Sequence, residues 1–350
     1  MFWYKYSIFR LFKLASIIFL FGALSVFDVT AQQSNTVFRE MYQSEVLNCR
    51  LEGDLSSLIE DSHNSDELKA VFSYEKNNTW ISREVNLQLR GRFRRLTCDF
   101  PPLFLKFRKK ELRKDGLAEH NDIKLVTHCL NDPLISRQNI LREYLAYRIF
   151  NILTPHSYQV QLARIVYLDE SGLLSKQRRF ALLIEDSDEL AERLLSEECD
   201  DCLNPDIASM DWHDLALLSL FQYMIGNTDW SVLMNRNVKL FKEKQTGNFF
   251  SIPYDFDFSG WVNAPYAIPN SELGLSKLTD RCYIGISLNE ELRNEALSKF
   301  IEKKDEIYSL VRSFKKLDGK SRKELLEYLD DFYEHLDGID MKFANRALKW

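Results

Sequence analysis

Residues 211–230 of this 350-residue chain read DWHDLALLSLFQYMIGNTDW. Asp211 is a typical N-cap residue, and the segment Trp212–Ile225 is apolar on nearly every face of a helix. A helix with that pattern is buried, and Gly226 is a common residue just beyond a helix end. The stretch therefore predicts a buried helix that leads directly into a loop containing Asp229.

A β-hairpin and a second acidic loop are predicted immediately afterwards. The strands are Asn237–Phe241 and Phe249–Pro253, with a turn around Gly247 between them. Asp255 and Asp257 follow the second strand in the sequence Tyr-Asp-Phe-Asp-Phe. Both acidic motifs thus lie at the ends of regular elements, where loops often present side chains to a ligand.

The order of these features suits phosphoryl transfer. Such a site needs an Asp that orients or deprotonates the attacking hydroxyl, and an Asn with a second Asp to hold the metal ions that bridge the phosphates. Asp229, Asn237 and Asp255 follow one another in that order, and Asp257 offers a further carboxylate. Oxygen ligands of this kind suit Mg²⁺ or Mn²⁺. Each motif alone is also common in turns and caps, so the prediction depends on finding both in this order.

The first half of the chain is rich in predicted strands. Alternating apolar and polar residues indicate strands within residues 37–130, as in Val85–Leu89 and Leu103–Phe107. Apolar residues four apart then predict one long helix from about Ser136 to Leu153. Two further strands and two charged amphipathic helices are predicted over residues 160–168, 180–184, 289–313 and 320–336.

The long helix carries a carboxylate, Glu143, on a partly apolar face, where a free charge would be costly. Lys124 and Lys106, each on a predicted strand, are candidate cationic partners that would also contact phosphate groups. Chain order favours Lys124, because kinases place the phosphate-binding lysine on a strand before the helix that carries its partner Glu. An exposed Glu143 paired with neighbouring arginines on the helix is the alternative.

A basic cluster is found at Arg90–Arg95, the densest after the N-terminal segment. A turn at Gly91 could aim the guanidinium groups of Arg90 and Arg92 at phosphate oxygens. A solvated basic surface with no special role is the alternative.

The N-terminus has the order of a secretory signal peptide. Met1–Lys13 contains three basic residues and no acidic one, and Leu14–Phe27 is apolar. Small residues follow at Val29-Thr30-Ala31, so residues 1–31 are predicted to be removed near Ala31. The apolar run is shorter than the roughly 20 residues that a membrane-spanning helix needs, although an uncleaved anchor is the alternative. We expect an exported protein, periplasmic or extracellular, without stable membrane insertion.

The composition disfavours several classes of protein. A formal net charge of −6 argues against nucleic acid as a partner, because phosphate backbones attract basic surfaces. A hydrophobic content of 45% fits a well-packed folded chain rather than a disordered one. Six histidines are scattered singly, so no histidine-based catalytic group is indicated.

The cysteines permit disulfide bonds, since an even number occurs in a chain with an export signal. Cys199 and Cys202 have the spacing of some zinc or redox sites. A zinc site wants about four ligands, and only His213 is near; acidic neighbours also disfavour a reactive thiolate. A structural disulfide or two inert thiols are expected there. The sequence leaves the pairing open among Cys49, Cys98, Cys129, Cys199, Cys202 and Cys282.

Several segments resemble the spore-coat CotH kinase family, a group of atypical secreted kinases, and the likeness is closest to exported members from Bacteroidetes-type bacteria. The resemblance extends over roughly Arg83 to Gly285, and the Asp motifs are its most specific part. The segments that carry it are Leu89–Arg94, Phe100–Leu103, Lys124–Cys129, Arg142–Tyr147, Leu183–Glu185, Ile225–Ser231 and Pro253–Asp257.

The resemblance implies binding of ATP with Mg²⁺ or Mn²⁺ and transfer of the γ-phosphate to Ser or Thr residues of a protein. By motif position, Asp229 looks like the catalytic residue, and Asn237 and Asp255 look like metal ligands. Glu185 falls where the segment between the lobes of such a kinase would lie beside the adenine.

We therefore expect an α+β protein with a kinase-like, two-lobed arrangement. The N-terminal lobe, residues 32–185, would be β-rich with one long helix. The C-terminal lobe, residues 186–350, would be helical and would carry the catalytic and metal motifs. The expected function is that of an exported metal-dependent protein kinase. A kinase-like module that binds a nucleotide or a partner without catalysis, and a metal-dependent phosphohydrolase with Asp255 and Asp257 as ligands, are the alternatives.

Overall fold

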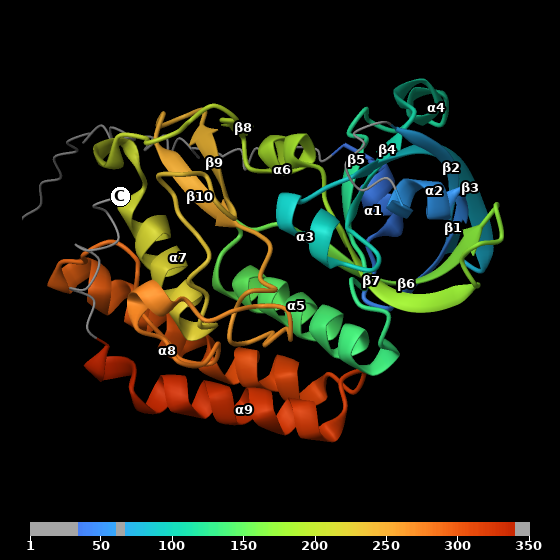
Figure 1. Ribbon diagram of the computed structural model, residues 1–350. Helices are drawn as coiled ribbons and strands as arrows, with labels where there is room; N and C mark the ends of the chain where they lie inside the picture. The colour runs from blue at the N-terminus through green and yellow to red at the C-terminus, as the bar shows by residue number, and fades with distance from the viewer. Residues whose placement is uncertain (1–33, 61–66, 340–350) are drawn as a thin grey trace, which may run out of the picture. The chain divides into compact units, whose positions relative to one another are not determined.

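A β-barrel forms the N-terminal half of the structure (Figure 1). The computed structural model describes residues 34–60 and 67–339, so the expected signal peptide, residues 1–31, and its cleavage near Ala31 lie outside the described residues. The strands follow the order β1-β2-β3-β4-β5-β7-β6 around the barrel. Their bounds are β1 (Leu47–Gly53), β2 (Leu68–Lys76), β3 (Thr79–Leu89), β4 (Leu103–Phe107), β5 (Asp122–Val126), β6 (Val160–Asp169) and β7 (Gln177–Ile184).

The barrel core follows from the alternation of apolar residues along the strands. In β1, Leu47, Cys49 and Leu51 are buried and the residues between them are more exposed, because successive side chains of a strand point to opposite faces. The start of β6, Val160–Ala163, and the end of β7, Phe180–Ile184, are buried on both faces. On β7, Leu183 belongs to the barrel core, whereas Leu182 belongs to the core that surrounds the long helix. These two strands therefore join the barrel to the rest of the chain.

The prediction of a kinase-like, two-lobed fold is wrong. Within the expected N-terminal lobe of residues 32–185, the strands form a closed mixed barrel of seven strands rather than the open sheet of a kinase lobe. The barrel closes because β1 pairs with β6 in parallel, which places Leu47 opposite Ala163. Alternation along a strand predicts which face is buried, but it does not predict which strand lies beside it.

The described part of the expected C-terminal lobe, residues 186–339, combines helices with a small sheet of order β10-β9-β8. The predicted buried helix is confirmed as α7, whose N-terminal amide groups are capped by the carboxylate of Asp211. Helix α5 packs against β6, β7 and α8, and α8 packs against α7 and α9 (Figure 1). The remaining helices and strands are α1 (Val37–Met41), α2 (Leu55–Glu60), α3 (Arg92–Thr97), α4 (Lys109–Lys114), α5 (Pro133–Leu153), α6 (Ser187–Arg193), β8 (Ser196–Glu198), η1 (Ile207–Ser209), α7 (Trp212–Met224), β9 (Val238–Glu243), β10 (Phe249–Pro253), η2 (Ser271–Leu273), α8 (Glu290–Ser313), α9 (Gly319–Glu334) and η3 (Leu336–Gly338).

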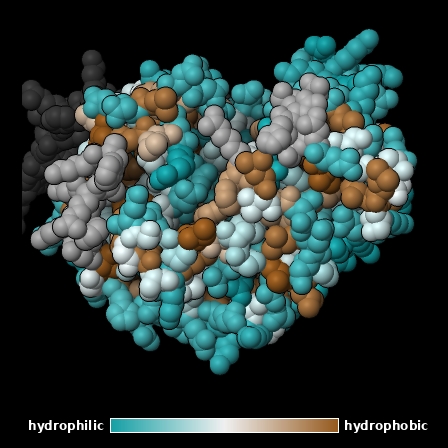
Figure 2. Space-filling model, viewed as in Figure 1, coloured by the Kyte–Doolittle hydropathy of each residue, from teal (hydrophilic) through white to brown (hydrophobic). Residues whose placement is uncertain are grey.

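The face of the molecule drawn in Figure 2 is mostly polar. Figure 2 shows hydrophilic residues over much of the visible face, with small and separate apolar areas among them, as is normal for a folded protein. Among the described residues, none of the helices combines the length and the apolar character needed to cross a membrane.

Two disulfide bonds occur among the described residues, Cys98–Cys129 and Cys199–Cys202. The second decides between the two outcomes expected at the Cys-x-x-Cys segment, since these cysteines form a disulfide rather than two inert thiols. The first joins the residue that follows α3 to the segment that follows β5. Helix α3 is thereby fastened to the barrel.

The two acidic loops are joined by backbone hydrogen bonds. Gly260 N donates to Gly226 O at 3.1 Å, and Trp261 N donates to Ile225 O at 2.9 Å. Gly260 is also closely packed against a third segment, since a Cβ atom there would lie 2.7 Å from the backbone oxygen of Leu278. The pairing places the loop after α7 beside the loop after β10.

Gly260→Ala is expected to lower the free energy of unfolding by about 1–3 kcal/mol, because a methyl group must displace backbone in a closely packed region. Gly338→Ala is the matched control, since no atom lies within 4 Å of a Cβ built there. Chemical denaturation of both variants measures the difference. Equal stability of the two variants would contradict the close packing of Gly260 against the backbone at Leu278.

Candidate functional site

A buried arginine lies at the centre of the candidate site. Arg94, on α3, donates from Nε to Asp257 Oδ2 at 2.8 Å and from Nη2 to Asp255 Oδ1 at 2.5 Å. Its Nη2 also lies 3.6 Å from Glu143 Oε2 on α5. The guanidinium therefore links the barrel side of the protein to α5 and to the loop after β10.

The carboxylates around Arg94 are not fully compensated. Burial raises the pKa of Glu143 to about 8 and that of Asp257 to about 6, although the charge of Arg94 acts to lower both. Oxygen Oε1 of Glu143 is buried and has no hydrogen-bond partner among the described residues. Three carboxyl groups thus share one guanidinium, so the cluster would accept a further cation.

The backbone of Asp255 adopts a left-handed conformation, with φ 63°, which is uncommon for residues other than glycine. Two interactions hold it there. Asp255 N donates to Tyr147 Oη at 3.0 Å, and the ring of Phe256 is fully buried with its centroid 4.6 Å from that of Tyr147. This conformation lets Asp255 and Asp257 both contact Arg94.

Asp229 is held in the loop after α7 by its neighbours. Asn237 Nδ2 donates to Asp229 Oδ2 at 2.9 Å and to its carbonyl oxygen at 2.7 Å. Arg236 Nε lies 3.4 Å from Asp229 Oδ1. Burial raises the pKa of Asp229, and the negative charge of Asp255 raises it further while Arg236 lowers it. The structure therefore brings the predicted Asp229, Asn237, Asp255 and Asp257 into one region.

The two predicted lysines lie in different surroundings, and neither is the ion-pair partner of Glu143. Lys124 Nζ donates to Ser187 Oγ at 2.8 Å and lies 5.0 Å from the ring centroid of Tyr158. Burial lowers the pKa of Lys124 to about 8, and the positive charge of Arg90 lowers it as well. Lys106 instead pairs with Glu67 at 2.8 Å, at the surface.

Most of the basic cluster lies on a short helix, α3, which begins directly after Gly91. Gly91, with φ 77°, precedes α3, and this helix buries Arg94. Arg90 lies over the ring of Phe104 at 5.4 Å and influences the pKa of Lys124, so these two cations are near each other. The side chain of Arg92 lies outside what the structure describes.

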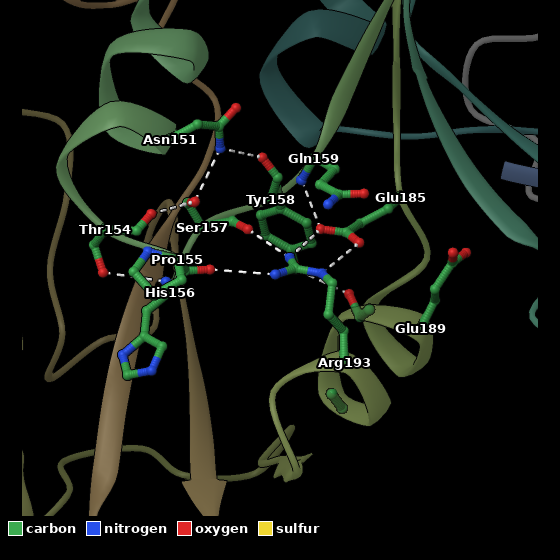
Figure 3. A network of polar contacts seen from close by, with 12 residues as sticks. Asn151, Thr154, Pro155, His156, Ser157, Tyr158, Gln159, Glu185, Glu189 and Arg193 are labelled. Carbon is green, nitrogen blue, oxygen red and sulfur yellow. Dashed lines mark hydrogen bonds and ion pairs between the residues drawn. The ribbon is translucent and has the colours of Figure 1, made fainter. Parts of the chain in front are cut away.

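Glu185 is fully buried in a network that links the end of β7 to the loop after α5 (Figure 3). Its Oε1 accepts from Arg193 Nη2 at 2.7 Å and from Gln159 N at 2.6 Å. Arg193 also donates to the carbonyl oxygens of Pro155 and Ser157. This geometry gives Glu185 a role in connecting elements, and its expected place beside adenine stays a prediction.

Arg94 is the site residue that the sequence reasoning missed. The sequence placed it in the basic cluster but singled out Arg90 and Arg92 as phosphate ligands. Its contacts with Asp255 and Asp257 join residues more than 160 positions apart, at separations of 161 and 163. The nearby Cys98 is the feature of the sequence that could have drawn attention to this segment. A disulfide bond at Cys98 restricts the position of the helix that carries Arg94.

The oxygen donors fit Mg²⁺ or Mn²⁺. Within the described residues, no group of three or more His, Cys, Asp and Glu side chains could hold a metal ion. Mg²⁺ is commonly bound by one or two carboxylates together with substrate phosphates, rather than by a cage made of protein alone. Asp255 and Asp257 supply two such carboxylates, beside an oxygen of Glu143 that is buried without a hydrogen-bond partner.

Comparisons with known proteins do not identify a family. No model of a protein family matches the chain. No curated protein matches it with significant similarity. The candidate site is therefore interpreted from its own geometry.

Arg94→Met is expected to destabilise the protein by about 3–5 kcal/mol, because removing one partner leaves buried carboxylates without compensation. Adding Glu143→Gln should restore part of this loss by removing one of the charges. Arg108→Met is the control, since Arg108 forms ion pairs only at the surface, where a pair is worth about 1 kcal/mol or less. Urea unfolding of the four proteins tests this, and a loss equal to that of the control would contradict the central role of Arg94.

The stability of the protein should depend on the ionisation of Glu143. Its pKa is raised from 4.5 to about 8 on folding, so its stabilising effect is complete below pH 4.5 and is lost as the pH rises through 8. Glu143→Gln should therefore reduce the fall in melting temperature between pH 6 and pH 9, in metal-free buffer. The exposed Glu334→Gln is the control. If the melting temperatures of the wild type, Glu143→Gln and Glu334→Gln change in the same way with pH, the prediction is wrong, because Glu143 would then be ionised already at pH 6.

Proposed function

We propose that this protein is a metal-dependent phosphotransferase that binds ATP and transfers its γ-phosphate to a hydroxyl group of a protein. The excess of buried carboxylate around Arg94 supports this proposal most directly. Glu143, Asp255 and Asp257 surround one guanidinium, and Asp229 lies close enough to Asp255 for their repulsion to affect its pKa. A divalent cation that arrives with the phosphates of a nucleotide would compensate this charge.

Each residue then has a chemical role. Asp255 and Asp257 would hold Mg²⁺ or Mn²⁺, which offsets the charge of the phosphoryl group during transfer. Asp229 would accept the proton of the attacking hydroxyl, since burial moves its pKa toward the range of a general base. Asn237 orients Asp229 through its two hydrogen bonds, and its expected role as a metal ligand stays part of the proposal.

The cations on the barrel side would contact the phosphates. Lys124 and Arg90 lie near each other, and their mutual repulsion disfavours two positive charges without an anion between them. A nucleotide phosphate would relieve this repulsion. We assign the phosphate contact to Lys124 rather than Lys106, because Lys106 already pairs with Glu67 at the surface.

Export of the protein is also part of the proposal. The two disulfides, Cys98–Cys129 and Cys199–Cys202, are typical of proteins in an oxidising compartment such as the periplasm or the cell exterior. They agree with the signal-like order of residues 1–31.

A second function, binding of a nucleotide without transfer, is favoured by one observation. Arg94 donates hydrogen bonds to both Asp255 and Asp257, the two carboxylates proposed to hold the metal. Labelled ATP distinguishes the possibilities, because label appears in a protein acceptor for transfer, in free phosphate for hydrolysis, and in neither for binding alone.

Asp255→Asn is expected to remove most of the stabilisation that ATP with Mg²⁺ confers on the folded protein. A ligand at a hundred times its Kd stabilises the native state by about 2.7 kcal/mol, which a thermal unfolding assay detects easily. Asp305→Asn, an exposed change on α8, is the control and should keep the full shift.

Asp229→Ala should behave differently, keeping the ATP-dependent shift but losing transfer of label. A shift that needs no metal, or that survives Asp255→Asn, would contradict the assignment of Asp255. Wild-type transfer in Asp229→Ala would contradict its role as the base.

A further inference from the structure

A pocket that contains several arginines lies at the N-terminal end of α5, beside the outer faces of β6 and β7. Its volume is about 300 Å³, which is enough for a small polar ligand. The residues that line it include Ser136, Arg137, Arg164, Arg178, Arg179 and Phe180. Arg137 precedes Glu143 by six residues, or about 9 Å along the axis of α5, so the pocket is separate from the cluster around Arg94.

Arg137, Arg164 and Arg178 of this pocket have no carboxylate partner within residues 34–60 and 67–339. Arg137 donates to Lys316 O at 2.8 Å. Arg178 donates to Asn48 Oδ1 at 3.2 Å, and Arg164 lies over the ring of Phe180 at 4.8 Å. Each of these contacts is with a neutral group, so three positive charges remain together in a protein of net charge −6. Arg179 lies on the other face of β7, toward the barrel core, because successive side chains of a strand point to opposite faces.

A buried donor in the pocket also lacks an acceptor among the described residues. The hydroxyl group of Ser136, which is 1% exposed, has no hydrogen-bond partner. A buried donor left unsatisfied costs about 1–3 kcal/mol, so a ligand that supplies oxygen acceptors would be favoured.

Neighbouring groups do not supply those acceptors. Asp132, the acidic residue adjacent to the pocket in the sequence, accepts hydrogen bonds from the backbone amides of Leu134 and Ile135. Burial lowers the pKa of Arg164, and the nearby positive charges of Arg178 and Arg137 lower it further. The arginines therefore repel one another in the absence of an anion.

We propose that this pocket binds a phosphate group, either of a soluble phosphate compound or of a lipid headgroup. Arginine forks match the oxygens of phosphate and bind them through two hydrogen bonds at once. Ser136 Oγ supplies a further donor. The site does not depend on the proposed ATP site, because it shares no residue with the cluster around Arg94.

Isothermal titration of the mature protein with inorganic pyrophosphate tests the soluble source. The titration is done in EDTA at fixed ionic strength, so that metal-dependent binding near Asp255 does not contribute. The pocket variant carries Arg137→Gln and Arg178→Gln. The control carries Arg312→Gln and Lys320→Gln, which remove the same charge from exposed positions on α8 and α9.

Pyrophosphate binding should weaken at least tenfold in the pocket variant and stay unchanged in the control. If the double variant fails to fold, the exposed Arg178→Gln alone should still weaken binding measurably. Equal weakening in the pocket variant and the control would overturn the proposal, since it would show a general effect of charge.

Sedimentation with vesicles tests the lipid source. Leu134, which is 71% exposed, lines the pocket and offers an apolar contact for a membrane surface. Binding to phosphatidylcholine vesicles that contain phosphatidate, lost in the pocket variant and absent with pure phosphatidylcholine, would identify the headgroup as the source. Absence of binding to both pyrophosphate and phosphatidate vesicles would overturn the proposal.

Discussion

The ion-pair cluster around Arg94 is the interaction on which the candidate site depends. Its guanidinium comes from α3, next to the barrel, and its carboxylate partners come from α5 and the loop after β10. A buried charge is tolerated only when partners surround it, so these three segments must stay together. Separating these segments would leave buried charges without partners. The ion-pair cluster therefore stabilises the fold as well as forming the candidate site.

The rest of the fold positions this cluster. The disulfide Cys98–Cys129 fastens the end of α3 to the segment after β5, and the ring of Phe93 packs edge-on against Phe258 with centroids 5.2 Å apart. The backbone pairing of Gly260 with Gly226 then brings the loop of Asp229 to the same place. Two acidic loops that are separated by a hairpin in the sequence thus become one charged region.

Barrel closure has a different consequence on the outer surface. Because β1 pairs with β6, both β6 and β7 lie in the interior of the sheet and present an outer face to α5. Where that face extends past the start of α5, it is lined by arginines around Phe180 instead of apolar residues. The protein therefore contains an acidic cluster and a basic pocket on opposite parts of one helix, which suits two separate polar ligands.

The sequence by itself determined the features that depend on neighbouring residues. The apolar run after Asp211 and the turn around Gly247 predicted α7 and the hairpin, because helix burial and turn chemistry are local. Local order also placed Asp229, Asn237, Asp255 and Asp257 around that hairpin. The closure of the barrel and the choice of Arg94 as the partner of Glu143 were decided only by the tertiary structure. Alternation of apolar and polar residues along a strand predicts which side chains are buried, and a carboxylate on an apolar face predicts that a cation lies nearby. Neither pattern identifies a partner that lies far away in the sequence.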